Sequence, residues 1–553
     1  MGTSRHLLVL RYMIDTLHVR GQIQAELVRK RDAVVELVAR IKSVRASPVS
    51  AHSREKRTSP CRGWYLVKSF TSTPVAARTR RTCLTGALGK SLMPSSAEPN
   101  TSTRITSTHA SDPRPHVVIV GGGFAGLTAA RQLAKADVRI TLIDRTNHHL
   151  FQPLLYQVAM AVLNPADITV PIRWMLRNQP NVTVLMASVD AVDISHRTIA
   201  LDEGTTMVEW DYLVLATGAR HAYFGHPDWE QNAPGLKSIE DALEMRRRFL
   251  LSFEAAERAS AAGERAALLT FVIVGGGPTG VELAGMIPEI TKKAMKGDFR
   301  RIDPGSARVI LLEGGPRILA QFPDSLSNRA RRDLEQLGVD VRTGTVVTSV
   351  DDEGVTLASG ERILAHTVFW GAGNQASPLG KQLGVPLDRA GRVIVESDLS
   401  VPGHEHVFVV GDLASVTMPG GTPVPSVAPA ANQMGEHAAK SIMHDLRGTG
   451  RTPFAYFNKG DLATIGRNRA VAAIGKVRLQ GTIAWIAWLF IHILYLAGFR
   501  NRLTVLVQWA YQYFTYQRGV RLITGTTAHR LLTTSREREQ QRKTERQSGR
   551  DAA

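Results

Sequence analysis

Cysteine is nearly absent from this chain of 553 residues, which contains only Cys61 and Cys83. Because both precede residue 104, the rest of the chain can form neither a disulfide framework nor a cysteine-rich metal site. Three histidines that could draw attention as ligands lack metal-ligand spacing, so we expect them to be structural: His148, His149 and His437. We therefore predict no metal site.

Acidic residues are scarce near the N-terminus. Residues 1–115 carry 20 Lys and Arg against 7 Asp and Glu, a net +13 of the total +19. Residues 45–112 have no core pattern, so we predict a basic, largely disordered extension over 1–112. Three explanations stay open: an organellar transit peptide, a tail that touches nucleic acid or anionic lipid, or a start codon assigned too early, with synthesis beginning at Met93. We favour the last and expect no nucleic-acid partner.

Long hydrophobic runs are also scarce. The strongly apolar run 483–499 has 17 residues and contains His492. At about 1.5 Å per residue it spans roughly 26 Å, the short limit for crossing a bilayer. Arg500 and Arg502 interrupt it before 503–516, which is again rich in Trp and Tyr. Trp and Tyr beside Arg are typical of the headgroup level, so we predict two membrane-associating helices in one leaflet. The alternative is a buried helix pair that forms a soluble dimer.

What the chain does contain is two glycine motifs of one type, about 155 residues apart. Each follows a short apolar run and reads Gly-x-Gly-x-x-Gly, with Gly121, Gly123 and Gly126 in the first and Gly275, Gly277 and Gly280 in the second. Each predicts a strand, a tight turn and a helix start, whose N–H groups and dipole hold a pyrophosphate. Two such sites predict two dinucleotides, and a chain that binds both most simply passes a hydride between them.

An acidic residue follows each motif at the end of a second apolar stretch. Asp144 ends the stretch 139–143, and Glu313 ends the stretch 308–312. A carboxylate at this place hydrogen-bonds the ribose hydroxyls and repels a 2′-phosphate. We therefore predict that NADH is preferred over NADPH.

The order of elements predicts an α/β fold in which one domain is inserted into another. A strand enters a glycine turn at Gly218, helical sequence at 240–261 leads into the second motif, and the chain returns to the first lobe at 406–412. Domain termini lie close together, which permits insertion. We predict a first Rossmann-type dinucleotide-binding domain formed by 113–235 and 376–446, with a second one inserted at 236–375. A C-terminal helical region at 447–525 and a charged tail at 526–553 follow.

The tandem motifs, the Ala-Thr-Gly turn ending at Gly218 and the late Gly411-Asp412 resemble the two-dinucleotide fold of glutathione-reductase-like flavoproteins, the pyridine nucleotide-disulfide oxidoreductase superfamily. The resemblance implies FAD in the first domain, with Asp412 at its ribityl chain, and NADH in the inserted domain. Asp412 could also act as a helix N-cap. Flavoenzymes that reduce disulfides or oxidise sulfide need cysteines beside the flavin, and none occurs between Arg104 and Ala553.

Within this superfamily the chain resembles the type II NADH:quinone oxidoreductases, single-subunit respiratory-chain NADH dehydrogenases that pump no protons. Four stretches carry the resemblance: 147–159, 274–285, 427–433 and the C-terminus. It implies NADH oxidation, hydride transfer to FAD and two-electron reduction of a membrane quinone. It also implies that Glu282 handles protons and Gln433 contacts the quinone. The family's Ala-Gln-x-Ala-x-Gln motif has Pro429 in place of its first Gln here.

Both residues could instead have purely structural roles. Glu282 could merely complement the helix dipole, and Gln433 could be a surface glutamine. The other function considered is a soluble NADH-dependent flavoprotein reductase of a ferredoxin-type partner. For the favoured function we expect a homodimer on the bilayer surface, at the cytoplasmic face of a bacterial inner membrane or, alternatively, at a mitochondrial inner membrane.

Overall fold

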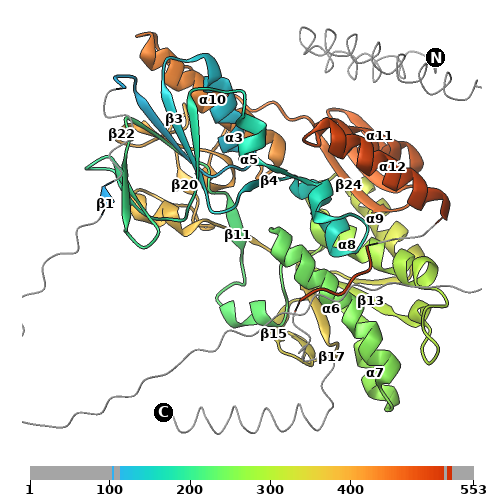
Figure 1. The fold of residues 1–553 in the computed structure, drawn as a ribbon. Helices are drawn as coiled ribbons and strands as arrows, with labels where there is room; N and C mark the ends of the chain where they lie inside the picture. Colours follow the sequence, from blue (N-terminus) through green and yellow to red (C-terminus); the bar gives the residue numbers. More distant parts are fainter. Residues whose placement is uncertain (1–102, 105–111, 516–519, 526–553) are drawn as a thin grey trace, which may run out of the picture. The chain divides into compact units, whose positions relative to one another are not determined.

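The structure, a computed structural model, describes residues 103–104, 112–515 and 520–525. Most of the predicted N-terminal extension and the whole predicted charged tail lie outside these residues. Two residues of the extension are described as strand: β1 (Thr103–Arg104) pairs in parallel with β9 (Thr206–Glu209). The α/β fold class is confirmed (Figure 1).

The first domain is built on a six-stranded sheet in the order β21-β22-β10-β2-β3-β6 (Figure 1). Its five parallel strands are β2 (His116–Val120), β3 (Arg139–Asp144), β6 (Val182–Met186), β10 (Tyr212–Leu215) and β22 (His404–Val409), and β21 (Ser400–Val401) is antiparallel at one edge. Every residue of β2 and β10 is buried, as expected for central strands covered on both faces. Since β22 lies beside β10, the chain leaves this sheet and returns to it.

Helices and smaller strands complete the first domain. The helix α3 (Phe124–Gln132) packs against α10 (Ala428–Leu446), which follows the return of the chain. A Cβ at Gly435 would lie 2.1 Å from the Ala125 carbonyl oxygen, so this glycine lets the two helices touch. The remaining elements are β4 (His148–Leu150), α4 (Leu155–Ala159), β5 (Thr169–Pro171), α5 (Ile172–Leu176), β7 (Val189–Asp193), β8 (Thr198–Leu201), β20 (Val393–Ile394) and β23 (Ala414–Ser415).

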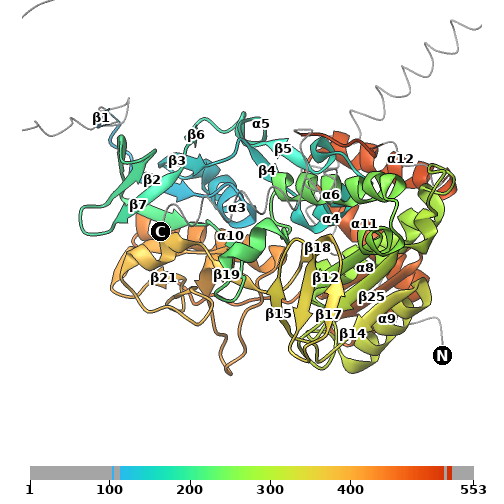
Figure 2. The ribbon, with the colours of Figure 1, turned by 90° about the horizontal axis from the view of Figure 1, so that it is seen from below.

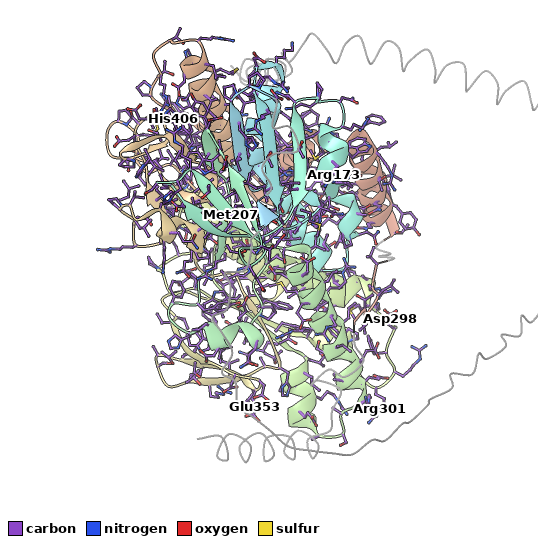
Figure 3. The ribbon with its side chains drawn as sticks, turned by 60° about the vertical axis from the view of Figure 1, so that its left-hand side comes forward. Arg173, Met207, Asp298, Arg301, Glu353 and His406 are labelled. Atoms are coloured by element: carbon purple, nitrogen blue, oxygen red, sulfur yellow. The ribbon has the colours of Figure 1, made fainter. Side chains whose placement is uncertain are left out.

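The inserted domain repeats the plan with a four-stranded parallel sheet in the order β14-β13-β12-β18 (Figure 2). These strands are β12 (Thr270–Val274), β13 (Arg308–Leu312), β14 (Val339–Arg342) and β18 (Thr367–Trp370). Its helices are α6 (Ile239–Arg258), α7 (Ala262–Leu268), α8 (Pro278–Glu289) and α9 (Asp324–Leu337), and its antiparallel strands are β15 (Val347–Val350), β16 (Gly354–Leu357) and β17 (Arg362–Leu364). Figure 3 labels Glu353 and Arg301 in this domain and His406 in the first.

The two chain crossings between the domains run side by side. The outgoing crossing contains β11 (Ala219–His221) and the returning one contains β19 (Asn374–Ala376), and these strands pair antiparallel. The crossings therefore bring residues of both domains to one place, where the candidate site lies.

The C-terminal region differs from the helical region predicted for 447–525, because it begins with a sheet. The strands β24 (Asp461–Gly466), β25 (Arg469–Ile474) and β26 (Val477–Gln480) form an antiparallel meander. Only then come α11 (Gly481–Tyr495) and α12 (Phe499–Thr515). The predicted pair of helices is thus confirmed, but their break lies at 496–498 and not at the arginines, since Gly498 adopts a φ of +84°.

The C-terminal sheet contacts the inserted domain through α8. This helix contacts β12 and β13 of its own sheet and also β24. A Cβ at Gly285 would lie 1.6 Å from the Ile465 carbonyl oxygen, so only glycine permits the approach. Within the described ranges, no helix combines the length and the apolar character that crossing a membrane requires.

Candidate active site

The first glycine turn has the geometry of a dinucleotide site. Gly121 adopts a φ of +105°, and a Cβ there would lie 2.4 Å from the Ala216 carbonyl oxygen. A Cβ at Gly126 would lie 1.9 Å from the Gly121 carbonyl oxygen, whereas one at Gly123 would meet nothing within 4 Å. No side chain caps α3, so none occupies the N–H groups at its start. The turn thus fits the pyrophosphate of FAD.

The second turn repeats this arrangement in the inserted domain. Gly275 has a φ of +107°, and its Cβ would lie 2.6 Å from the backbone nitrogen of Ala372. A Cβ at Gly280 would lie 1.8 Å from the Gly275 carbonyl oxygen, and one at Gly277 would again meet nothing. The N-terminus of α8 likewise has no side-chain cap. The predicted strand, turn and helix are confirmed at both motifs.

The two acids that end β3 and β13 are held against these turns. Asp144 accepts a hydrogen bond from the Gly122 N–H at 2.6 Å, and Glu313 accepts one from the Gly276 N–H at 2.6 Å. The second oxygen of Glu313 accepts from the Gly315 N–H at 2.6 Å. Each carboxylate is therefore fixed beside its turn, where a ribose of the bound dinucleotide would lie.

A cavity of about 200 Å³ lies where the two domains and the crossings meet. It brings together Glu282 of α8 and Asp412, which lies three residues after the end of β22. Side chains that sequence analysis did not single out complete the lining, among them Tyr156, His221, Lys237, Trp370 and Asn374. One wall thus comes from each nucleotide-binding domain, which is the place where two dinucleotides could exchange a hydride.

Burial controls the protonation of Glu282. It raises the pKa of this carboxyl well above its ordinary value, and a hydrogen bond from the Thr464 backbone N–H of β24 lowers it less. Burial is the larger of the two causes, and α8 has no acidic residue in its first turn, where the helix dipole acts most strongly. The neutral acid is therefore favoured, and it can hold a proton for transfer.

Asp412 lies opposite a lysine in the same cavity. Burial raises the pKa of Asp412, while the charges of Lys237 and Arg392 lower it. Burial also lowers the pKa of Lys237. Asp412 stands in a short turn that begins with Gly411, whose φ is +70°. A carboxylate and an ammonium group thus face one cavity, ready to bind polar groups of a ligand.

Gln433 does not line this cavity. Its amide nitrogen donates to the carbonyl oxygens of Phe457 at 3.0 Å and Pro429 at 3.2 Å, and its amide oxygen accepts from the Phe457 N–H at 2.9 Å. The side chain therefore fastens the segment that leads into β24. Pro429 occupies the first turn of α10, where a missing N–H removes no helical hydrogen bond.

Gly218 lies at the start of the outgoing crossing. It has a φ of +66°, and its carbonyl oxygen accepts from the Ser377 N–H of the returning crossing at 3.1 Å. This predicted residue thus holds the two crossings together beside the cavity.

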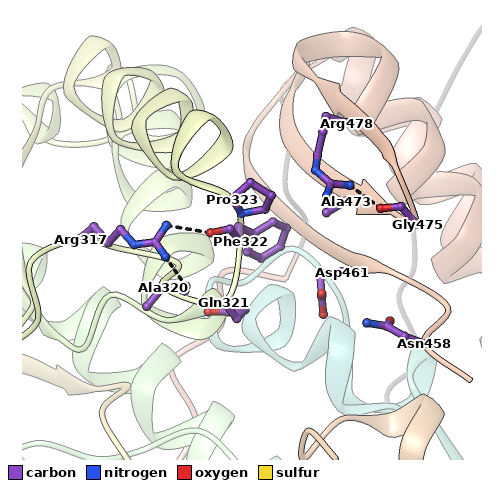
Figure 4. A pocket seen from close by; sticks show the side chains of 10 residues that line it. All are labelled: Arg317, Ala320, Gln321, Phe322, Pro323, Asn458, Asp461, Ala473, Gly475 and Arg478. Carbon is purple, nitrogen blue, oxygen red and sulfur yellow. Dashed lines mark hydrogen bonds between the residues drawn. The ribbon is translucent and has the colours of Figure 1, made fainter. Parts of the chain in front are cut away.

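A larger cavity of about 400 Å³ lies elsewhere, between the loop 317–323 and the C-terminal sheet (Figure 4). Arg317 in its wall donates to the carbonyl oxygens of Phe322 and Ala320, each at 2.8 Å. None of the predicted site residues lines it. Size alone therefore does not identify the active site. The smaller cavity is the candidate, because it contains Glu282, Asp412 and Lys237.

The missed residues come together only through the fold. Trp370 ends β18 immediately before the Gly371-Ala372-Gly373 turn, close to the predicted end of the inserted domain at residue 375. Tyr156 lies within the stretch 147–159 that carried the family resemblance. Lys237 had no local signal, because only the crossing brings it to Asp412.

Two glycine turns of the same geometry, each at the uncapped start of a helix in its own parallel-sheet domain, are typical of a two-dinucleotide flavoprotein. In agreement, residues 115–435 match the model of the pyridine nucleotide-disulphide oxidoreductase family, and residues 458–516 match that of the NDH2 C-terminal domain. NDH2 from Plasmodium falciparum in complex with NADH shares the fold, with a TM-score of 0.68, 19% identity and coverage of 74% of this chain and 100% of that one.

Sequence relatives give the narrower assignment. The chain is 46% identical to the type II NADH:quinone oxidoreductases NdhA and Ndh of Mycobacterium tuberculosis, over 77% and 76% of its length and 93% and 92% of theirs. The demethylphylloquinone reductase NdbB of Synechocystis is 30% identical over 72% of this chain and 96% of its own length. The chain belongs to the type II NADH:quinone oxidoreductase family.

Proposed function

We propose that this chain oxidises NADH and reduces a membrane quinone by two electrons, with FAD in the first domain and NADH in the inserted one. The observation that carries the proposal is the cavity in which Glu282 of the NADH side meets Asp412 of the FAD side. When bound, FAD supplies the redox chemistry by accepting a hydride and passing on two electrons. The protein supplies binding, orientation and protons.

The glycine turns and their acids bind and select the nucleotides. The open faces at Gly123 and Gly277 leave room for the pyrophosphates beside uncapped helix starts. Asp144 and Glu313 then hold the ribose hydroxyls, and a carboxylate at Glu313 opposes a 2′-phosphate. Orientation is the main contribution here, because hydride transfer needs little acid or base assistance.

Quinone reduction also consumes two protons, and Glu282 is the proposed proton-handling group. Burial raises the pKa of this carboxyl and so favours its protonated form beside the cavity. As pH rises through this raised pKa, the proton is lost and the acid can no longer act. Quinone turnover is therefore expected to fall on the alkaline side.

The quinone role of Gln433 stays a prediction. Both hydrogens of its amide nitrogen are used by the Pro429 and Phe457 carbonyl oxygens, and its amide oxygen accepts from the Phe457 N–H, so only the second lone pair of that oxygen is left for a quinone. The location of Gln433 supports this role, because the residue joins the first domain to the segment that enters the C-terminal region.

The membrane contact is proposed for α11 and α12. Large apolar side chains project outward at helical spacing, including Ile483 at 66% exposure, Phe499 at 69% and Phe514 at 80%. Such a surface suits the interface of a bilayer, with Arg500 and Arg502 near anionic headgroups. Attachment to the cytoplasmic face of a bacterial inner membrane, the mitochondrial alternative and a homodimer remain predictions.

One assay tests the function. Purified holoenzyme should oxidise NADH much faster than NADPH and should pass electrons both to a short-chain quinone and to ferricyanide. Ferricyanide reports on the NADH and FAD half alone. Reduction of ferricyanide without reduction of any quinone would contradict the proposal and favour a reductase of a ferredoxin-type partner, which has no need of exposed apolar helices.

A further inference from the structure

One exposed phenylalanine near the redox cavity has a strained backbone. Phe224 adopts a φ of +50°, which a residue with a Cβ rarely does because this conformation costs free energy. Phe224 is also 68% exposed, so burial of its ring offsets little of that cost. Strain of this kind persists where the surrounding structure imposes it, and it is concentrated at functional sites. Packing alone therefore does not account for Phe224.

The two residues before Phe224 are firmly held. The Trp370 indole N–H donates to the Ala222 carbonyl oxygen at 3.0 Å, and the Ala222 N–H donates to the Gly373 carbonyl oxygen at 3.4 Å. The ring of Tyr223 is buried, with its centroid 5.1 Å from that of Trp370. The chain therefore enters Phe224 from a rigid support, which can maintain the strained conformation.

The Phe224 ring lies at the rim of the redox cavity. A Cβ at Gly373 would lie 2.7 Å from Phe224 Cζ, so the absence of a side chain at Gly373 makes room for the ring. The ring centroid lies 6.3 Å from that of Trp370. Trp370 and Gly373 both line the cavity together with Glu282. Phe224 thus lies against two residues of the cavity wall and is itself accessible from outside.

The same part of the cavity wall borders the path that NADH would follow. The pyrophosphate fits at Gly277, and Glu313 holds the ribose on the adenine side, so the nicotinamide end must extend toward Glu282. A Cβ at Gly371 would lie 3.4 Å from the Gly280 backbone nitrogen, which places the turn after β18 beside the start of α8. A nicotinamide ring that reaches the cavity therefore passes this turn and comes next to the exposed aromatic ring.

We propose that Phe224 covers the nicotinamide ring of NADH at the rim of the redox cavity and so orients it for hydride transfer. The aromatic ring offers the nicotinamide a flat apolar surface, and such ring pairs stabilise each other beyond the area that they bury. Because the backbone under the ring is fixed before NADH binds, binding loses little loop entropy. Orientation is the main contribution that a protein makes to hydride transfer. The inference rests on the proposed binding of NADH to the inserted domain.

The test uses holoenzyme with ferricyanide as the acceptor, so that quinone and membrane play no part. Phe224→Gly removes the ring and permits the φ of +50° without strain, so the melting temperature should stay the same or rise. The KM for NADH should nevertheless rise by roughly three- to tenfold, the effect expected of one aromatic ring contact, and flavin reduction in a single turnover should slow. Phe224→Tyr keeps the ring and should behave as the parental enzyme. Leu364→Ala, which shortens another exposed apolar side chain of the inserted domain, is the matched control and should change nothing.

Binding of NAD⁺ and of ADP-ribose to the oxidised holoenzyme, measured by calorimetry, identifies the end of NADH that Phe224 contacts. ADP-ribose lacks the nicotinamide ring, so Phe224→Gly should weaken NAD⁺ binding by the same factor and leave ADP-ribose binding unchanged. Parental NAD⁺ affinity in Phe224→Gly, or an equal loss of affinity for both ligands, would overturn the inference. A parental protein that binds neither ligand and oxidises no NADH would instead contradict the proposed function.

Discussion

The two glycine turns are nearly identical, but their helices are covered by different parts of the chain. The helix α3 is covered by α10 of its own domain, whereas α8 is covered by β24 of the C-terminal region. Two residues after the third glycine of each motif, α3 has Thr128 and α8 has Glu282. Thr128 donates to Asn432 of α10 at 3.0 Å, and Glu282 faces the cavity. If Glu282 handles protons as proposed, the same turn serves binding alone in one domain and binding with proton chemistry in the other.

The largest expected effect comes from breaking the cover of α8. Gly285→Ala places a Cβ against the Ile465 carbonyl oxygen and should displace β24. We expect the free energy of unfolding to fall by about 1–3 kcal/mol or more, and the surroundings of Glu282 to change. Thermal unfolding and quinone turnover would measure it. Gly263→Ala in α7, which meets nothing within 4 Å, is the control and should be neutral or slightly stabilising. An unchanged melting temperature in Gly285→Ala would refute this contact.

The second-largest effect is expected from replacing Glu282, the acid that distinguishes the second turn from the first. Glu282→Gln should lower quinone turnover by roughly 100-fold, the lower range for loss of an acid or base, while flavin reduction by NADH continues. The parental enzyme should lose quinone turnover as pH rises through the raised pKa of Glu282, and the variant should lack this limb. Thr128→Val, at the matched position of the first turn, should keep the parental pH profile. A variant with parental quinone turnover would remove the proton-handling role from Glu282.

A third change separates the C-terminal sheet from its helices. Deletion from Thr482 onward leaves β24 over α8 but removes α11 and α12, so it should release the protein from membranes and keep NADH turnover with ferricyanide. Turnover of a membrane-bound quinone should also fall, because the shortened protein no longer lies at the bilayer. Deletion of residues 526–553 alone is the control and should leave the protein bound. Fractionation at low and high salt measures both, and sedimentation of the shorter protein with membranes would contradict the anchor.

The smallest expected effect sharpens the comparison of the two acids. Glu313→Gln should narrow the preference for NADH over NADPH by roughly tenfold, about 1.4 kcal/mol, because the repulsion of a 2′-phosphate is lost. Asp144→Asn, its counterpart at the other turn, should weaken FAD retention and leave the nucleotide preference alone. Rates with both nucleotides and the flavin content of purified protein would decide. Equal rates with NADH and NADPH in the parental enzyme would remove the role given to Glu313.

Sequence patterns predicted the features that depend on near neighbours. Gly121, Gly275, Asp144 and Glu313 each stand at a fixed distance from an apolar strand, so their turns and strand ends could be placed. The sheet at 461–480 was not predicted, because its short strands lie within a region whose apolar helices dominated the interpretation. The engagement of Gln433 by Phe457 and the meeting of Lys237 with Asp412 depend on contacts between distant segments, which no local pattern records.

The helix α12 makes hydrogen bonds to the first domain on its inner side and exposes large apolar side chains on its outer side. Asn501 donates to the Thr169 carbonyl oxygen at 3.0 Å at one end, and Gln512 holds the other end. A peptide that folds only when it meets lipid loses conformational entropy at that moment, which weakens adsorption. In this protein the ordering is completed during folding. Adsorption should therefore leave helical content unchanged, and nearly all the apolar area that enters the interface should contribute to residence time on the bilayer.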